Sequence, residues 1–276
     1  MKNNKIVQVI QKTLKTFSEH DMNVFSGYAT LYILMAMIPL LMLIITVINI
    51  MPWFSASDFA AFFFQFMPDL PEVQNMLKDV IENLNSQSSA LLASISALTT
   101  LWSASNGISA IQAGLEEIQG TRRASLKGKP MALLFTVMYV LLIPSLLAFQ
   151  LLRHPLEQGI ISILTSLHLE SMVSLVLTIM QFGGILTLVL AVAVIVLTYT
   201  FLPYGKRGIE TQLPGSIFTC IAAGVFTWAF GFFMGTFWKA SSVYGSLAAI
   251  FLCAMWMKFI ITILFYGASF NKALEN

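Results

Sequence analysis

Charged residues are absent from several long stretches of this 276-residue chain, and each stretch is long enough to cross a membrane as a helix. Uncharged runs of 36, 33, 23, 35 and 28 residues separate Asp21 from Asp58, Glu82 from Glu116, Lys129 from Arg153, Glu170 from Lys206 and Glu210 from Lys239. The stretch from Lys239 to Lys272 is interrupted by Lys258 alone. A hydrocarbon core about 30 Å thick requires a helix of about 20 apolar residues. The pattern therefore predicts six transmembrane helices.

The predicted spans are apolar on consecutive residues, as in Ala132–Leu147, which favours helices over strands of alternating polarity. Only 10% of the chain is charged, and a soluble domain could not cover its surface with so few charges. We predict an all-α, polytopic membrane protein that forms a single membrane domain over residues 1–276. Its spans are expected at Gly27–Ile50, Leu91–Ala113, Met131–Leu152, Ser174–Leu202, Leu213–Gly235 and Tyr244–Phe270.

Lys and Arg residues in short loops indicate which side of the membrane each loop faces, since they are retained in the cytoplasm. Eleven of the fifteen fall before the first span, in the second and fourth loops and in the C-terminal tail. Lys78, Arg153 and Lys239 fall on the other side, and Lys258 lies inside the sixth span. Both termini are therefore predicted to be cytoplasmic.

Two segments outside the spans show helical amphipathic patterns. In residues 1–20, apolar positions from Ile6 to Phe17 alternate with lysines at helical spacing, which predicts a cytoplasmic helix on the membrane surface or packed under the bundle. Residues 52–88 form an external loop with apolar residues at helical spacing from Val73 to Leu84. We expect short helices there, as a cap, a lid or a surface for a partner.

Polar residues inside the spans are the candidate functional positions. Thr99, Ser103 and Asn106 share one helical face with Trp102, and this face either lines a wet cavity or lipid-headgroup pathway or bonds neighbouring helices. Lys258 lies about ten residues, roughly 15 Å, from the cytoplasmic end of its span. A lysine near mid-bilayer costs about 2.5–3.5 kcal/mol, and no Asp or Glu lies in any predicted span to neutralise it. An anionic ligand such as a lipid phosphate, or water and backbone carbonyls, would have to stabilise it.

The sequence provides no visible catalytic chemistry. It has no P-loop, its three histidines are isolated, and no cluster of histidines and carboxylates has the spacing of a metal site. The net charge is +2, and the predicted topology already accounts for where the basic residues lie. No basic patch is therefore left that could bind nucleic acid. We therefore expect neither an enzyme nor a cofactor nor a metal, and no nucleic-acid partner.

Several motifs together resemble the YihY/BrkB family of bacterial inner-membrane proteins, whose members were historically mislabelled ribonuclease BN. They include Phe25-Ser-Gly-Tyr-Ala-Thr-Leu-Tyr32 and Leu101-Trp-Ser-Ala-Ser-Asn-Gly-Ile-Ser109, followed by Val243-Tyr-Gly-Ser-Leu-Ala-Ala249 near the C-terminus. The positions that carry the resemblance are Asp21, Tyr28, Tyr32, Pro39, Pro214, Gly215, Tyr244, Gly245, Trp256 and Gly267. The order of the motifs matches over nearly the whole chain.

The resemblance implies a six-helix envelope protein connected with lipid or lipopolysaccharide export. Combined with Lys258 and the polar face of the second span, it favours the translocation of lipids or lipid-linked molecules, with membrane lipids as the partner. The alternative is a non-transporting scaffold that recruits an envelope protein or a second copy of itself. The ribonuclease label conflicts with the absence of a basic RNA surface.

Overall fold

The computed structural model describes residues 2–48, 74–75, 78–79, 82–83, 90–121, 129–166, 183–205, 207–237 and 246–275. These residues are helical apart from short turns and contain no strand, which confirms the all-α prediction. The elements are α1 (Lys2–Glu19), α2 (Met22–Ile48), α5 (Ala90–Gln119), α6 (Lys129–Ser166), α8 (Gly183–Phe201), α9 (Ile209–Phe237) and α11 (Ser246–Glu275).

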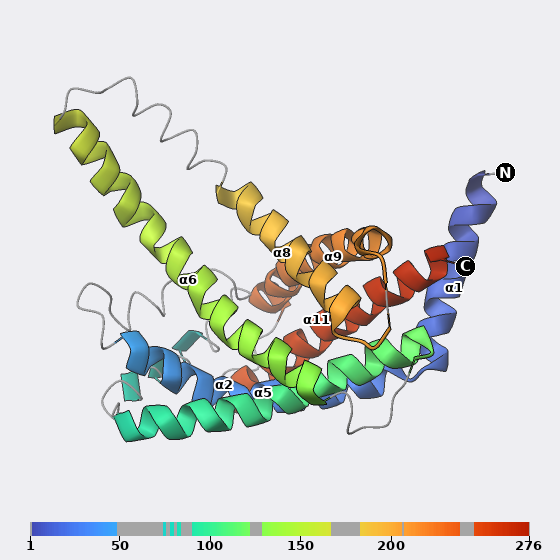
Figure 1. Cartoon of the computed structure of the whole chain (residues 1–276), viewed down its shortest axis with the longest axis horizontal. Coiled ribbons are helices and arrows are strands. Elements are labelled where there is room, and N and C mark those ends of the chain that lie inside the picture. The colour runs from blue at the N-terminus through green and yellow to red at the C-terminus, as the bar shows by residue number, and fades with distance from the viewer. Residues whose placement is uncertain are drawn as a thin grey trace.

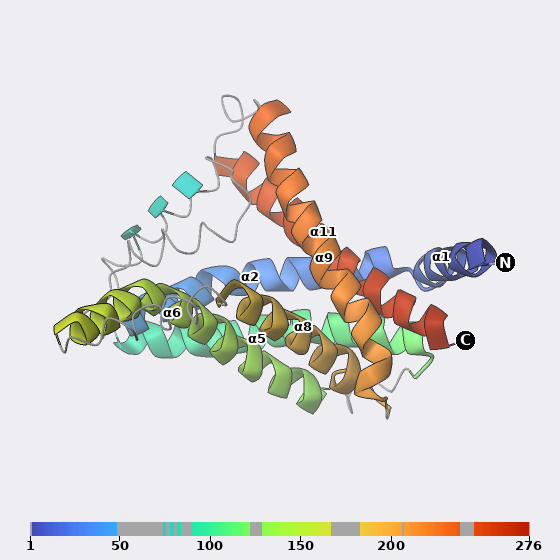
Figure 2. The same ribbon diagram turned by 90° about the horizontal axis from the view of Figure 1, so that it is seen from above.

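The long helices converge at one end of the molecule and spread apart toward the other (Figures 1 and 2). The C-terminus of α11 and the amphipathic helix α1 lie at the converging end. At the spreading end, α6 points away from α2 and α5 (Figure 1), while α9 and α11 project in a different direction (Figure 2). The packing that holds the bundle together is therefore concentrated toward one end.

The core lies where α5 packs against α2 and α11. Phe265 of α11 is fully buried, and its ring fills a space that Gly114 of α5 leaves open. A methyl group at Gly114 would lie 2.6 Å from that ring, and one at Gly107 would lie 2.7 Å from Ile33 of α2. Small residues thus allow the helices to approach closely, which is how helices associate where lipid replaces water.

Large apolar side chains cover much of the outer surface of the described helices. Trp102, Leu98 and Trp228 are each at least 70% exposed, whereas a soluble protein buries most of its large apolar side chains. Three described segments are long and apolar enough to cross a membrane: Met22–Leu43, Ile209–Met234 and Ile250–Glu275. Pro130–Leu142 and Thr187–Phe201 are shorter apolar helices, so the count of six spans stays a prediction.

Helix α6 is longer than the predicted third span. The prediction ended the span at Leu152, but the helix continues to Ser166. The charges of Arg153 and Glu157 mark the end of the apolar segment. The helix nevertheless continues past them, because a helix needs only its own backbone hydrogen bonds. In the predicted external loop, the described residues, such as Lys78 and Glu82, are helical, and the rest of it lies outside the described residues.

Asp21 forms the turn between α1 and α2. Its φ of 51° is in the left-handed region, which Asp tolerates better than most residues because its short side chain can bond locally. The Val24 amide donates to the Asp21 carbonyl at 2.8 Å, starting α2 immediately after the turn. As a result, α1 departs from the direction of α2 and runs across the converging end of the bundle (Figure 1).

Candidate functional site: a polar junction and an exposed lysine

Polar side chains, most of them buried, gather where α5, α9 and α11 meet the segment after α8. We call this set the polar junction, and it consists of Gln112, Glu116, Arg207, Gln212, Asn271 and Glu275. Gln212 and Asn271 are fully buried and Glu116 is 5% exposed. Because burying such groups is costly unless they are hydrogen-bonded, their partners decide whether the cluster is structural or free to bind something else.

Asn271 joins α11 to α9 through both atoms of its side-chain amide. Its Oδ1 accepts a hydrogen bond from the backbone N–H of Gly215 at 2.6 Å. Its Nδ2 donates to the backbone carbonyl and to the Oε1 of Gln212, at 3.1 and 3.2 Å. Pro214 lies inside α9 and has no N–H, so α9 lacks one backbone hydrogen bond next to the Gly215 amide that donates to Asn271.

Gln212 extends this network toward the end of α11. Its Nε2 donates to Glu275 Oε1 at 3.2 Å and to the Thr211 hydroxyl at 3.0 Å. Its backbone carbonyl also accepts from the Ser216 hydroxyl at 2.8 Å. Each polar atom of this buried amide pair therefore has a partner, which fixes the register of α9 against α11.

The same two helices touch through glycines. A methyl group on Gly215 would lie 2.2 Å from the carbonyl oxygen of Gly267, and one on Gly267 would lie 1.9 Å from the Thr219 hydroxyl. No larger residue fits at either position without moving a backbone. One turn deeper, the buried Tyr199 hydroxyl of α8 contacts Thr219 at 2.8 Å and donates to the Leu264 carbonyl of α11 at 2.6 Å.

Helix α5 ends in a turn that delivers Glu116 to the junction. Gly120, with a φ of +68°, donates to the Glu117 carbonyl at 3.0 Å, and Thr121 donates to the Glu116 carbonyl at 2.9 Å. These two bonds form a Schellman motif, which glycine at this position permits. The Glu116 carboxylate accepts from Gln112 Nε2 at 3.1 Å and from the Tyr204 amide at 3.2 Å.

Arg207 completes the junction between the ends of α8 and α5. Its guanidinium donates to the Tyr204 carbonyl at 3.2 Å and to the Thr121 hydroxyl at 3.4 Å. A cation at the C-terminal ends of two helices is favoured by their dipoles. Burial lowers the pKa of Arg207 below its ordinary value, and the nearby carboxylates of Glu275 and Glu116 oppose that shift.

Lys258, the charge predicted near the middle of the sixth span, lies near the middle of α11. Its side chain is exposed, and Phe251 and Phe259 on the same helix are exposed as well. Its backbone carbonyl accepts from the Thr262 hydroxyl at 2.8 Å. Among the described residues no carboxylate contacts its ammonium group.

The predicted polar face of α5 lies at the border of the helix packing. Trp102 is 70% exposed and Thr99 is exposed, with its hydroxyl donating to the Ile95 carbonyl. Ser103 is buried and Asn106 is half-buried. The face is thus turned partly outward, and nothing links it to Lys258 among the described contacts.

The positions that carry the family resemblance fall into structural roles. Asp21 makes the turn before α2. The rings of Tyr28 and Tyr32 pack against each other, with their centroids 4.8 Å apart. Trp256 Nε1 donates to the Thr227 hydroxyl of α9 at 3.2 Å. Pro39 lies inside α2, whereas Tyr244 and Gly245 lie outside the described residues. Gly215 and Gly267 meet at the α9–α11 contact, and Pro214 precedes Gly215 in α9, so motifs far apart in sequence build one helix contact.

The sequence analysis did not single out the residues of the polar junction. Gln212, Ser216 and Thr219 recur at steps of four and three at the start of the fifth span, with Gln212 just before it, and Asn271 follows the sixth. This periodicity of amides and hydroxyls was a usable signal for a polar helix contact. Charge counting passed over it because none of these side chains is charged.

Comparison with known proteins identifies relatives of the chain. The description of a family called Virulence factor BrkB matches residues 13–276. A protein of Bacillus subtilis (strain 168) named as ribonuclease-like, YfkH, is 23% identical over 97% of this chain and 95% of its own.

A UPF0761 membrane protein of Xanthomonas campestris pv. campestris (strain B100) is 28% identical, over 29% of this chain and 19% of its own. A UPF0761 membrane protein of Xanthomonas axonopodis pv. citri (strain 306) matches with the same identity and coverage. No solved structure matches the chain.

Proposed function

Since the chain belongs to the Virulence factor BrkB family, we propose that this membrane protein moves lipids or lipid-linked molecules between the leaflets of the bacterial inner membrane. The observation that carries the proposal is the position of Lys258. It is an exposed cation about 18 Å along α11 from Ser246, in a segment apolar enough to span a membrane.

A cation at this depth requires a partner. Placing Lys near the bilayer centre costs about 2.5–3.5 kcal/mol, and among the described residues no carboxylate forms an ion pair with Lys258. A lipid phosphate passing along the helix would neutralise it, and charge-assisted hydrogen bonds to phosphate are among the stronger contacts available. Phe251 and Phe259 would line the path of the acyl chains on either side.

The shape of the bundle supports movement at one end and rigidity at the other. Where the helices converge, the bonds of Asn271 fix α9 to α11, and the carboxylate of Glu116 fixes α5 to the segment after α8. Toward the other end the helices spread apart (Figure 1). A protein that admits lipid between its helices needs such a fixed end, because the spreading end must separate without unfolding the bundle.

Six spans with both termini in the cytoplasm are part of the proposal. Both ends of the chain lie at the converging end of the bundle (Figure 1). An even number of crossings returns a chain to the side where it began. The basic residues Lys12, Lys15 and Arg207 also lie toward this end, which supports its assignment to the cytoplasmic side.

The scaffold alternative is weaker because the small-residue seams that glycines of α5, α9 and α11 form are used inside the molecule. Gly107 and Gly114 receive side chains of α2 and α11, and Gly215 meets Gly267. These seams are therefore not available to a partner helix. We also propose no catalytic step: the described residues contain no group of three His, Cys, Asp or Glu that could hold a metal ion.

The test is lipid movement in vesicles that contain the purified protein. Vesicles with a fluorescent phospholipid in both leaflets are treated with an impermeant quencher, and the fraction quenched reports exchange between leaflets. Protein-containing vesicles should lose clearly more than half of the signal, whereas empty vesicles lose about half. Equal quenching in the two samples, with folded protein present, would reject the transport proposal in favour of the scaffold.

A further inference from the structure

The outer surface of α1 combines an uncovered apolar row with exposed lysines. Helix α1 lies across the converging end of the bundle rather than along it (Figure 1). Its inner face is anchored: the Phe17 ring is buried and stacks on Tyr266 of α11, with ring centroids 4.0 Å apart. Thr13, one turn earlier, is buried beside it.

The sequence pattern predicted one apolar face on this helix, and the structure divides it in two. Phe17 faces the bundle, whereas Val7, Ile10 and Leu14 are 49%, 52% and 52% exposed. At 100° per residue these three lie within an arc of about 60°. An apolar row of this size on a helix that is already anchored requires a second, apolar neighbour.

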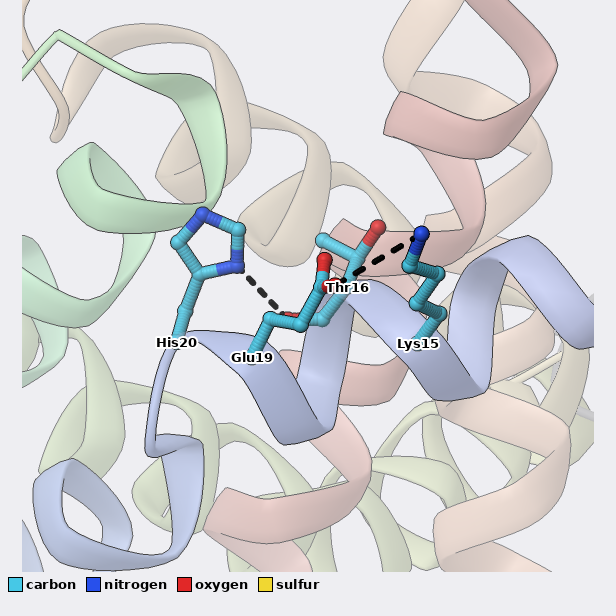
Figure 3. Close-up of polar contacts among 4 residues, drawn as sticks. All are labelled: Lys15, Thr16, Glu19 and His20. Atoms are coloured by element: carbon cyan, nitrogen blue, oxygen red, sulfur yellow. Dashed lines mark hydrogen bonds and ion pairs between the residues drawn. The ribbon is translucent and has the colours of Figure 1, made fainter.

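The rest of the helix surface is basic. The segment Lys2–Glu19 contains four lysines and one glutamate, a formal charge of +3. Figure 3 shows Lys15 reaching toward Glu19, at 3.6 Å, while the His20 ring reaches back to the Thr16 carbonyl at 2.8 Å and closes the end of the helix. Lys12 is exposed, and no carboxylate contacts it among the described residues.

We infer that α1 is a surface helix that binds anionic phospholipid at the membrane face where both termini lie. Val7, Ile10 and Leu14 enter the boundary between headgroups and acyl chains, and the charges of Lys12 and Lys15, on the polar side of the helix, attract the anionic headgroups. An anionic lipid surface supplies an apolar layer and negative charge together, and it adjoins this end of a membrane bundle. A protein partner would need an apolar surface and negative charge at positions that match the apolar row and the lysines of α1.

The inference does not depend on lipid transport, because a scaffold protein could carry the same surface helix. Its test uses the full chain in nanodiscs of phosphatidylcholine, with and without phosphatidylglycerol. Hydrogen exchange of the backbone amides from Val7 to Leu14 is measured by mass spectrometry. We expect exchange to slow when phosphatidylglycerol is present and to accelerate again at high salt.

The lysines are tested by substitution. Lys12→Gln should reduce the protection given by phosphatidylglycerol by about fivefold, and the double variant Lys12→Gln/Lys15→Gln by roughly thirtyfold, since each lysine near an anionic surface contributes about 1 kcal/mol. Lys78→Gln is the matched control, because Lys78 is an exposed lysine in the predicted external loop. This control should leave the protection of α1 unchanged.

The apolar row is tested by Ile10→Ser/Leu14→Ser, which should lose protection in both lipid compositions. If this variant unfolds in a thermal scan, Val7→Ser replaces it. Equal protection in neutral and anionic nanodiscs, or protection unaffected by the lysine substitutions, would overturn the inference. Protection that appears only together with a dimer on size-exclusion chromatography would also overturn it and would make a second copy the partner.

Discussion

The backbone N–H of Gly215 donates a hydrogen bond of 2.6 Å to the Asn271 side chain, connecting α9 to α11 across 56 residues of sequence. Gly215 can come this close because it has no Cβ, and it follows Pro214, which lies inside α9 and has no N–H of its own. The two helices are thereby fixed at the end where the bundle converges.

Asn271→Ala should lower the free energy of unfolding by about 1–3 kcal/mol, because it leaves the Gly215 N–H and the Gln212 carbonyl without this partner. The measurement is the thermal unfolding midpoint of the detergent-solubilised protein. Gln11→Ala, at an exposed position of α1, is the control and should change little. Equal midpoints for both variants would show that Asn271 does not hold the helices together.

Gly215→Ala should destabilise the protein by about 1–3 kcal/mol or prevent its assembly, since the new methyl group would lie 2.2 Å from the Gly267 carbonyl oxygen. Gly224→Ala on the same helix is the matched control. No atom lies within 4 Å of a methyl group there, so this change should be neutral or stabilise by up to about 1 kcal/mol. The reverse order of stabilities would contradict the close α9–α11 contact.

Asp21→Gly should be tolerated, and Asp21→Val should cost about 1–2 kcal/mol, because a β-branched residue is strained at a φ of 51°. Unfolding midpoints of the two variants give the comparison. If a carboxylate function matters at this position instead of the backbone conformation, the glycine variant will be as defective as the valine variant.

Reporter fusions test the predicted topology. Green fluorescent protein joined to the C-terminus should fluoresce, because it folds in the cytoplasm. Alkaline phosphatase inserted in residues 52–88 should be active, because it requires the oxidising side of the membrane. An active phosphatase at the C-terminus would contradict both the orientation and the even number of spans.

The positions of the helices were largely predictable, because the uncharged runs report where lipid replaces water. The predicted fifth span, Leu213–Gly235, falls inside α9, and the sixth, Tyr244–Phe270, overlaps α11. The true ends differ because a helix continues past its apolar segment: α5 extends through Glu116 and α6 through Arg153. A charge marks the end of an apolar span but does not itself break the backbone hydrogen bonds that continue the helix.

The contacts between helices were not predictable in the same way. Periodicity shows which side chains share a face, but it does not show which helix that face meets, so the pairing of Gln212 with Asn271 was missed. The division of the α1 apolar face also depends on tertiary contact, since Phe17 and Leu14 look equivalent in the sequence. Lys258 was predictable because a single charge in an uncharged run needs no tertiary information to be noticed.

Lys258→Leu and Lys258→Arg together provide the most direct measurement of the proposed function. Leucine removes the cation and suits a membrane helix, whereas arginine keeps a phosphate-binding charge at the same depth. In the vesicle assay we predict that the leucine variant loses lipid exchange by at least about tenfold while its unfolding midpoint rises. The arginine variant should retain most of the activity. Unchanged exchange in a folded Lys258→Leu protein would contradict the account.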